Sequence, residues 1–591
     1  MASIFGMFET AKSGLSVAQQ NLKITGHNIA NADTAGYTRQ RLNTSAIDPS
    51  VSAYLLSQAD SAGAGRGVEA LGVKQIRSLY LDDQFRELNA DFNYSEYRTQ
   101  ALTYLEGLFD ERDEDGGLTA AIQNFYSALN TLTQDASSLE YRTNVQQQAL
   151  ALTEGFNIVY TEMKDLWQDQ NESIMADADE INSLADRISA LNAAIAKYER
   201  SGETANDLRD DRNLLLDTLS GLVNISCGGN ETNPSMVDVQ IGGIDLVTGV
   251  SVNRVEADGA YLHTEQIDEL TDRIASVNAD IAAAAAAGDP TDELTAALDG
   301  YIEDLSQFVE ISTAADADGV TNILFCGVYL VQGSAQADIA SAVEPDMTAW
   351  AELYRNRLTL DGASLDIGAG TVTGGSLYAH MEMVRGADAK AAGIPDYMSR
   401  LNALARAVAQ NVNTIHKMGF TYPADGMPSV DGVNFFNVAL IPDGSGGYVE
   451  DYSRITAGNF ALGDAVLESV YNIAAAAEPV DLSNPATESG NHEIISKLIA
   501  DLDNSGYYGM LNSIVGHLAT TLKSGRSILD TKASLLGSID TQRTSVSGVS
   551  TDEETTNLIV YKQTYQACSR VITAIDEMIN TLVNNTGLVG R

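Results

Sequence analysis

Apolar residues near the start of this 591-residue chain recur in alternating steps of four and three. That spacing places side chains on one face of a helix, and it is unbroken over about four heptads, so we expect an amphipathic helix with a coiled-coil seam. Asn31, Asp33 and Gly36 follow the pattern and are typical of a helix end. The seam residues are Ile4, Phe8, Ala11, Leu15, Ala18, Leu22, Thr25 and Ile29.

A second seam of the same spacing lies near the end of the chain. Ser550 or Thr551 can cap that helix, and the acidic residues 552–554 favour the helix dipole in its first turn. The seam residues are Leu558, Tyr561, Tyr565, Cys568, Ile572, Ile575, Ile579 and Leu582. Because both seams need apolar partners, we expect the two helices to pair with each other, with neighbouring copies, or with both. The alternative is two amphipathic helices packed on an ordinary globular core.

The middle of the chain reads as long helices followed by a mixed region. Residues 95–171 are strongly helical, and we expect them to pack with later helices at about 384–418 and 490–545. Alternating apolar and polar residues between glycines predict strands within 234–262 and 358–377.

The predicted fold class is therefore mixed and mainly α, with several domains, because 591 residues exceed what one hydrophobic core can organise. We expect a terminal coiled-coil domain, a helical bundle, an outer α+β region and an irregular segment with short strands. Their respective boundaries are 1–55 with 545–591; 56–179 with 378–420 and 490–544; 180–377; and 421–489.

The outer α+β region contains an internal repeat. Residues 180–226 align without a gap on 266–312 at an offset of 86, with 16 of 47 positions identical. Farther on, 245–249 matches 329–333 at an offset of 84. Each copy, 180–249 and 266–333, reads as helix, glycine turn, helix and short strands. We interpret this as a duplication; chance likeness between two amphipathic hairpins is the alternative.

The loop after the first helix carries a recognisable signature. Residues 28–39, with Ser13-Gly14-Leu15 and Gln19, resemble the N-terminal signature shared by rod, hook and hook-associated proteins of the bacterial flagellum. Residues 67–84 and 548–554 resemble the stretches that follow in that family, although Ser550-Thr551 stand where the family usually has Asn-Leu. The signature loop residues are Asn28, Asn31, Thr34, Gly36, Tyr37 and Arg39.

Three internal stretches, 208–223, 330–333 and 411–420, resemble the hook-associated protein 1 (FlgK) family. The resemblance implies a structural axial subunit that self-assembles into a tubular ring and joins hook to filament. Its implied partners are the hook protein, a second junction protein (hook-associated protein 3), and an export chaperone at the C-terminal helix. It further implies type III export without a cleaved signal peptide, and so an extracellular location at the hook–filament junction. The second repeat copy then looks like an insertion.

Two other functions remain open at this stage. The hook protein shares both terminal motifs of the flagellar family. A secreted adhesin or enzyme displayed on a flagellar scaffold, with 180–333 as its working part, would belong to a different class.

The net charge of −46 is unevenly distributed along the chain. Residues 1–45 carry +2 and residues 548–591 carry −2, so the whole excess lies on the middle of the chain. Ends that pack against copies of themselves should carry little repulsion, whereas an exposed middle can carry much. A surface this acidic argues against binding nucleic acid or anionic lipid. No apolar run approaches the roughly 20 residues of a membrane span.

Catalytic motifs are not found. The chain has no dinucleotide or phosphate loop, no nucleophile elbow, and no histidines at zinc-ligand spacing, so we expect no enzyme activity, cofactor or metal. We interpret His492-Glu493 and Asp210-Asp211 as solvated helix faces. Residues 316–319 resemble the start of a calcium loop but lack its closing glutamate. Cys568 fits a buried seam position, and a Cys227–Cys326 bond is left open.

Overall fold

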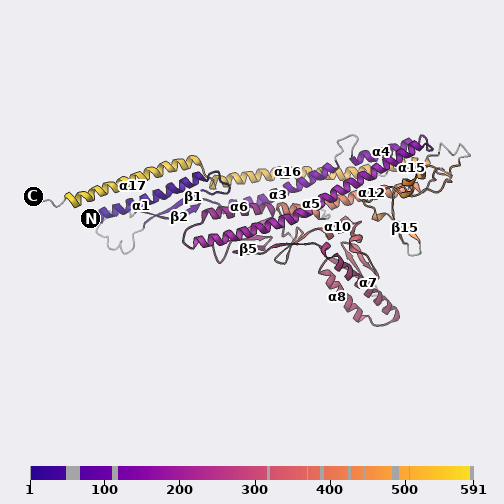
Figure 1. The fold of residues 1–591 in the computed structure, drawn as a ribbon, viewed down its shortest axis with the longest axis horizontal. Coiled ribbons are helices and arrows are strands. Elements are labelled where there is room, and N and C mark those ends of the chain that lie inside the picture. Colours follow the sequence, from indigo (N-terminus) through magenta and orange to yellow (C-terminus); the bar gives the residue numbers. More distant parts are fainter. Residues whose placement is uncertain are drawn as a thin grey trace, which may run out of the picture.

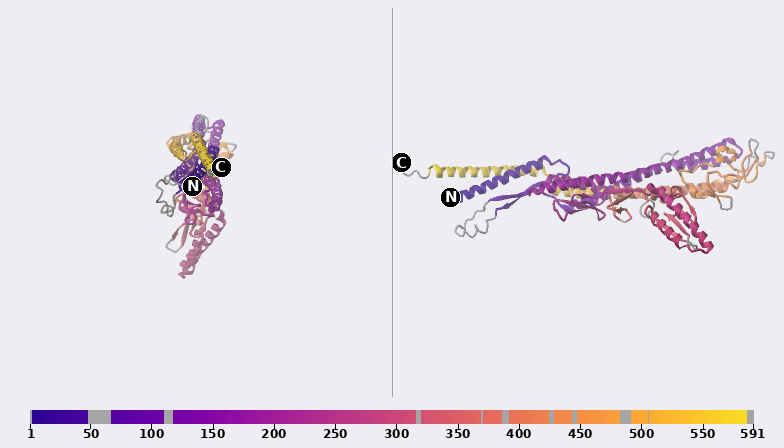
Figure 2. Two further views of the ribbon diagram at one scale, coloured as in Figure 1. Left: turned by 90° about the vertical axis from the view of Figure 1, so that its left-hand side faces the viewer. Right: turned by 60° about the horizontal axis from the view of Figure 1, so that its bottom comes forward.

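The molecule is elongated, with both termini at one end, a long helical bundle, and a side arm (Figures 1 and 2). The structure is a computed structural model that describes residues 2–47, 67–109, 117–315, 320–368, 370–385, 392–423, 428–442, 447–481, 491–504 and 506–585. Long helices with a few small antiparallel sheets make up the fold, which confirms the predicted mainly α, mixed class.

The two terminal helices, α1 (Ala2–Ala30) and α17 (Thr551–Asn585), pack along each other. The hydroxyl of Ser550 accepts a hydrogen bond from the backbone N–H of Glu553 (3.4 Å), which caps the start of α17. After α1 the chain forms a hairpin of β1 (Gln40–Ala46) and β2 (Val68–Gln75), paired from Gln40 opposite Gln75 to Ala46 opposite Val68. The hairpin leads directly into the bundle.

The helical bundle is built from segments distant in sequence, which pack through apolar stripes at helical spacing. Its longest member, α5, has 61 residues and continues far beyond residue 171, where the predicted helical segment ended. Helix α5 spans Leu139–Glu199. The other members are α3 (Leu79–Leu108), α4 (Gly117–Leu132), α11 (Gly375–Val384), α12 (Ile394–His416), α15 (Glu493–Asn504) and α16 (Tyr507–Ser547). Since α16 reaches Ser547, the break before the terminal helix lies a few residues beyond the predicted boundary at 545.

Both repeat segments have the same fold, a helical hairpin followed by a four-stranded antiparallel sheet in sequence order. The first copy uses the end of α5, α6 (Asn206–Leu222), β3 (Ile225–Gly229), β4 (Val237–Ile241), β5 (Ile244–Thr248) and β6 (Ser251–Val252). The second uses α7 (Thr264–Ala287), α8 (Asp292–Ser306), β8 (Ile311–Ala315), β9 (Thr321–Phe325), β10 (Val328–Gln332) and β11 (Ala335–Gln336).

A buried asparagine fastens the helices to the sheet in the same way in each copy. Asn192 donates to the carbonyl of Val237 (2.8 Å) and accepts from its N–H (3.2 Å). Asn278, 86 positions later, donates to the carbonyl of Thr321 (2.8 Å) and accepts from its N–H (3.0 Å). A repeated long-range hydrogen-bond pair of this kind favours duplication over chance likeness.

The second copy forms the arm, here called the spur (residues 260–354), which projects from the side of the bundle (Figure 1). It has its own apolar core and also contains η1 (Ala260–His263), α9 (Ile339–Val343) and α10 (Met347–Tyr354). The chain enters the spur after β7 (Val255–Asp258) and leaves it before β12 (Arg357–Leu360). These two strands pair with each other, and β13 (Ala363–Leu365) pairs with β12, so the spur begins and ends at one place.

The segment between α12 and α15 packs on the end of the bundle farthest from the termini. Its regular elements are β14 (Ala439–Pro442), β15 (Tyr448–Asp451), η2 (Tyr452–Arg454), α13 (Asp464–Glu468) and η3 (Val470–Asn472). Phe435, Phe436 and Phe460 are buried there against Phe125 and Phe156. Predicted strands at 358–377 are partly wrong, because residues from Gly375 onward begin α11.

Candidate functional site

The terminal helix pair brings the two predicted seams together. On α17 the predicted seam positions from Leu558 to Ile579 are the less exposed ones, and Ile575 is only 1% exposed. Leu582, at the end of the seam, is 44% exposed. On α1, Ala11, Ala18 and Thr25 are buried, and Phe8, Leu15, Leu22 and Ile29 are half-buried; the side chain of Ile4 lies outside the described residues.

Gly14 and Cys568 mark a close approach of the two helices. A Cβ atom built on Gly14 would lie 3.0 Å from the Cys568 sulfur, so a larger side chain would push the pair apart. The neighbouring Ser13 hydroxyl accepts a hydrogen bond from the N–H of Val68 (3.3 Å), which ties α1 to β2. The Ser13-Gly14 motif therefore serves local packing.

The pair leaves a second apolar stripe uncovered on α17. Val560, Val571 and Met578 are 50%, 46% and 44% exposed. They lie eleven and seven residues apart, which places them on one helix face beside the seam. Sequence reasoning missed this stripe, although its spacing is visible in the sequence. Since α1 leaves this stripe of α17 about half exposed, the surface is suited to packing against further helices.

The signature loop is organised around the buried side chain of Asn28. Its amide nitrogen donates to the carbonyl of Gln40 (2.9 Å) and to a carboxylate oxygen of Glu554 (3.2 Å). Its amide oxygen accepts from the N–H of Gln40 (3.0 Å) and from the hydroxyl of Tyr37 (2.8 Å). One asparagine thus joins the end of α1, the start of β1 and the first turn of α17.

Arg39 reinforces the same junction. Its guanidinium donates to Glu554 (2.8 Å) and Glu553 (2.8 Å), and its backbone N–H donates to the carbonyl of Ser547 (2.8 Å). Burial lowers the pKa of Arg39, but the hydrogen bonds and charges of Glu554 and Glu553 outweigh burial and raise it. The pKa of Tyr37 is raised, first by burial and then by the charges of Asp207, Asp210 and Glu554.

The remaining signature residues shape the turn. Asn31 donates to the carbonyl of His27 (3.0 Å) and accepts from the hydroxyl of Thr34 (3.4 Å). Gly36 has a φ of +77°, which L side chains rarely adopt, and a Cβ there would lie 3.3 Å from Leu214 on α6. The loop therefore sits directly against the first repeat copy.

Asp210 on α6 anchors that contact, which corrects the expectation of a solvated face. Asp210 is 5% exposed, and its carboxylate accepts from the N–H of Thr38 (3.1 Å) and the amide of Gln75 (2.7 Å). Burial raises its pKa, although these hydrogen bonds oppose the shift. Asp211 is exposed, as is Glu493, while His492 is half-buried. Paired aspartates look solvated in a sequence because their distant hydrogen-bond donors are invisible there.

Buried ion pairs connect the terminal region to the bundle. Arg543 on α16 contacts Asp217 of α6 (2.5 Å) and Asp82 of α3 (3.5 Å). Arg77 and Arg86 also bind these carboxylates, at 2.5 and 3.0 Å. Removing one partner would leave a buried charge unpaired, so this network holds the three helices in one arrangement.

A serine, a histidine and an aspartate meet inside the bundle, but not in the order that nucleophilic catalysis requires. The Ser376 hydroxyl donates to Asp177 (2.8 Å), and His380 lies 4.0 Å from that carboxylate and contacts Gln170 (2.8 Å). Burial raises the pKa of Asp177 to about 6 and lowers that of His380 to about 4. Ser376 is buried, and its hydroxyl donates to a carboxylate and not to a histidine, as a triad would need.

Metal and disulfide chemistry find little support among the described residues. That part of the chain has no group of three or more His, Cys, Asp or Glu side chains arranged to hold a metal ion, while the calcium-loop resemblance at 316–319 lies outside it. Cys227 and Cys326 are both free thiols in different repeat copies, and Cys568 faces α1. None of the described helices is long and apolar enough to cross a membrane.

Comparison with known families assigns the chain. The family described as the flagellar hook-associated protein FlgK helical domain matches twice, over residues 102–262 and 261–436, and the two matches meet where the spur begins. The flagellar basal body rod FlgEFG protein C-terminal family matches residues 541–585, and the flagella basal body rod protein family matches residues 8–38.

Two relatives named flagellar hook-associated protein 1 match nearly the whole chain. Flagellar hook-associated protein 1 of Bacillus subtilis is 27% identical over 100% of both chains, and that of Salmonella typhimurium is 24% identical over 97% of this chain and 98% of its own. The solved flagellar hook junction protein FlgK from Burkholderia pseudomallei has a TM-score of 0.48 and 14% identity over 78% of this chain and 100% of its own. Since the helical-domain matches cover more than half of its length, the chain belongs to the FlgK family of flagellar hook-associated proteins.

Proposed function

We propose that this chain assembles at the tip of the flagellar hook into a tubular ring that joins hook to filament. The observation that carries the proposal is the terminal helix pair, which covers its inner seam yet leaves Val560, Val571 and Met578 about half exposed. Neighbouring copies would cover this outer stripe. Contacts between different faces of identical subunits close into rings or extend into helical tubes, as such a junction requires.

Assembly would be coupled to ordering of the termini. A lone helix pair of this length is marginal in water, and each half-exposed apolar side chain that a neighbour buries adds about 1 kcal/mol. The terminal helices would therefore become stable only when copies meet, which prevents premature polymerisation. The near-neutral ends suit this contact, whereas the acidic middle and the spur would face outward.

The proposed partners follow from family membership. The ring would bind the hook protein on one side and hook-associated protein 3 on the other, and α17 would be held by an export chaperone before assembly. Export would use the flagellar type III apparatus without a cleaved signal peptide, which places the subunit outside the cell. We infer a structural role with no catalytic activity. The hook-associated domain match favours this role over that of the hook protein.

Binding of the purified full-length chain to isolated hooks tests the proposal. Hooks from a strain that lacks the chain should gain a compact addition at one end, visible by negative-stain electron microscopy, and only with that addition should they accept hook-associated protein 3. Binding along the whole length of the hook, or no binding, would refute the junction role.

A further inference from the structure

The first repeat copy holds a helix of the bundle on a surface that the second copy leaves open. On α6 the carboxylate of Asp217 accepts from the Nε of Arg86 on α3 (3.0 Å). The amide of Asn89, three positions after Arg86, donates to the hydroxyl of Ser220 (2.9 Å) and to the carbonyl of Asp217 (3.0 Å). These contacts leave Asp217 8% and Ser220 0% exposed. Helix α3 thus packs on the first copy through an arginine and an asparagine on one helix face.

The spur keeps both acceptors on α8. At the repeat offset of 86, Glu303 stands where the first copy has Asp217, and Ser306 stands where it has Ser220. The hydroxyl of Ser306 donates to the carbonyl of Glu303 (2.7 Å), as that of Ser220 donates to the carbonyl of Asp217 (2.6 Å). Helix α8 lies in the arm that projects from the bundle (Figure 1), and Glu303 and Ser306 are both exposed. The second copy therefore presents to solvent the acceptors that bind α3 in the first copy.

An open pocket of about 380 Å³ adjoins these acceptors and is lined by residues 306–311 and Arg357. The corresponding stretch of the first copy, 220–225, is covered by the start of α11 as well as by α3. A Cβ atom built on Gly375 would lie 2.2 Å from the carbonyl oxygen of Leu222. The pocket on the spur thus lies where packed chain covers the first copy.

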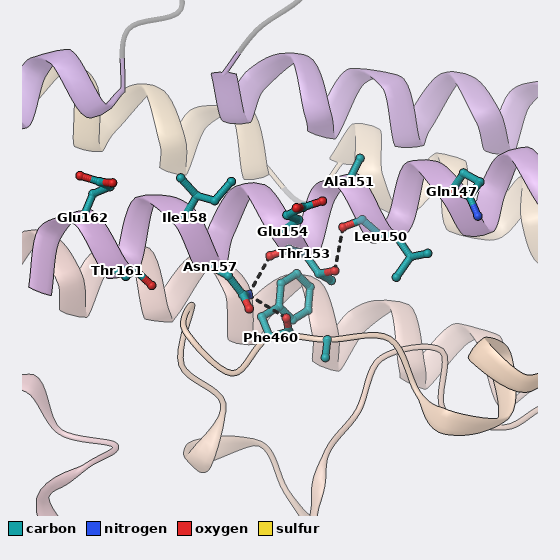
Figure 3. A pocket seen from close by; sticks show the side chains of 11 residues that line it. Gln147, Leu150, Ala151, Thr153, Glu154, Asn157, Ile158, Thr161, Glu162 and Phe460 are labelled. Atoms are coloured by element: carbon teal, nitrogen blue, oxygen red, sulfur yellow. Dashed lines mark hydrogen bonds between the residues drawn. The ribbon is translucent and has the colours of Figure 1, made fainter. Parts of the chain in front are cut away.

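A larger groove, of about 700 Å³, runs along α5 beside Phe460 (Figure 3). Its helical wall, residues 147–162, precedes the repeat, so the molecule holds no occupied counterpart of this groove. The pocket on the spur has such a counterpart. The side chains of α3 that fill it show the chemistry of a partner that the spur can bind.

The charge of the spur favours a basic partner. Residues 260–354 carry eighteen acidic side chains against one arginine, which gives a net charge of −17. Asp299 lies one turn before Glu303 on the same face of α8 and is also exposed. A helix that carries an arginine would therefore be attracted to this face as it approaches.

One position of the surface differs between the copies in a way that restricts the partner. Gln307 of the spur stands where the first copy has Gly221. A Cβ atom built on Gly221 would lie 3.2 Å from the amide nitrogen of Asn93, which lies four positions after Asn89 on α3. A helix that packs against Gln307 therefore needs a smaller residue than asparagine at that position.

We propose that α8 of the spur and the adjoining pocket at 306–311 are a docking site for an α-helix of another protein. That helix presents an arginine to Glu303, an asparagine three positions later to Ser306, and a small residue such as alanine four positions after the asparagine to Gln307. The spur is then a second docking module, which repeats with a separate partner the contact that the first copy makes with α3. This binding site goes beyond the proposed junction role and does not depend on it.

Binding of a helical peptide to the purified full-length chain tests the site. The probe is the α3 sequence 79–98 with Asn93→Ala, held helical by a lactam between Asp83→Lys and Glu87, positions that are both exposed on α3. Fluorescence anisotropy at low salt should show saturable binding of the labelled peptide to the parent chain. The peptide with Arg86→Glu should bind at least about tenfold more weakly, because it loses the charged contact with Glu303.

Variants of the full-length chain place the peptide on the spur. Glu303→Lys should weaken binding at least about tenfold, and it should bind the Arg86→Glu peptide more tightly than the parent chain does. The matched control is Asp304→Lys, because its first-copy counterpart, Thr218, stays exposed beside α3; its affinity should lie within about twofold of that of the parent. No saturable binding to the parent chain, or binding that Glu303→Lys leaves unchanged, would overturn the docking site.

Discussion

Asn28 and Glu554 are separated by 526 positions in the sequence, yet their side chains are joined by a buried hydrogen bond of 3.2 Å. The carboxylate of Glu554 also accepts from Arg39, which leaves it 3% exposed. This contact sets where α1 ends relative to where α17 begins. The alignment of the two seams along the whole helix pair depends on it.

Asn28→Ala should weaken assembly without affecting the bundle. It removes four hydrogen bonds and leaves Glu554 and Gln40 partly unpaired, a loss of about 2 kcal/mol, or roughly thirtyfold in affinity for isolated hooks. A binding titration with purified chain measures this effect. Asp33→Ala, at an exposed position of the same loop, is the control and should bind within about twofold of the parent. Equal affinity of both variants would show that the Asn28 contacts do not matter.

A charge in the inner seam should block assembly. Ile575→Asp places a carboxylate at a position that is 1% exposed, which costs more than about 3 kcal/mol in the helix pair. We expect no detectable incorporation into flagella, while the thermal unfolding of the bundle and spur stays unchanged by circular dichroism. Leu22→Asp on α1 should behave in the same way. Gln563→Asp, on the exposed side of α17, provides the control; normal incorporation of Ile575→Asp would refute the seam hypothesis.

A substitution in the outer stripe of α17 distinguishes the contacts within one copy from the contacts between copies. Val571→Asp alters a side chain that is 46% exposed at the edge of the seam, one turn before Ile575, so its carboxylate can stay in solvent and pairing of α1 with α17 should survive. Incorporation should nevertheless fall about tenfold, since the neighbouring copy would have to bury the charge. Parent-level incorporation of this variant would mean that the stripe stays solvated in the tube.

The spur should be removable. Its ends lie on paired strands, with Asp258 opposite Arg357, so residues 259–356 can be replaced by a short glycine-rich turn. Because Trp350 of the spur packs on Trp167 of α5 (4.4 Å between ring centroids), the deletion exposes that ring and costs about 1–2 kcal/mol. We expect a folded chain with a slightly lower melting temperature that still enters flagella. Loss of folding would show that the spur is integral to the bundle.

His416 should make the stability of the helical bundle sensitive to acid. Its ring contacts the carbonyl of Val433 (2.6 Å) through Nδ1 and accepts from the N–H of Ala474 (2.7 Å) through Nε2, so the neutral form is required. Burial lowers its pKa to about 4, below the unfolded value, and protonation therefore favours unfolding. The stability that this histidine gives is present above about pH 6.5 and is lost as the pH falls toward 4.

Urea unfolding at pH 7 and pH 5 measures the summed pH dependence, to which His416 should contribute about 2 kcal/mol and His380, whose pKa burial also lowers to about 4, a similar amount. His416→Gln should reduce the difference, whereas the partly exposed His263→Gln should not. The raised pKa of Asp177 works in the opposite direction between pH 4 and 6, because its protonated form is favoured in the folded state. A pH dependence unchanged by His416→Gln would contradict the assignment.

The sequence patterns predicted the features that depend on residues close together in the chain. The seams, the helix ends and the two copies of the repeat follow from spacing alone, because helical periodicity and internal likeness are properties of short stretches. The contacts that make a site of them are long-range. Nothing near Asn28 indicates Glu554, and nothing near Asp210 indicates that Thr38 and Gln75 bury it. The stripe that contains Val571 was missed because its role can be inferred only once α1 is known to cover the inner seam of α17.

Immunogold electron microscopy of intact flagella tests the central claim most directly. An antibody raised against the spur, which projects from the bundle and carries eighteen acidic side chains and a single arginine, would reach its target in the assembled structure. The account predicts a narrow band of label between hook and filament. Label along the whole hook, or flagella without label, would contradict it.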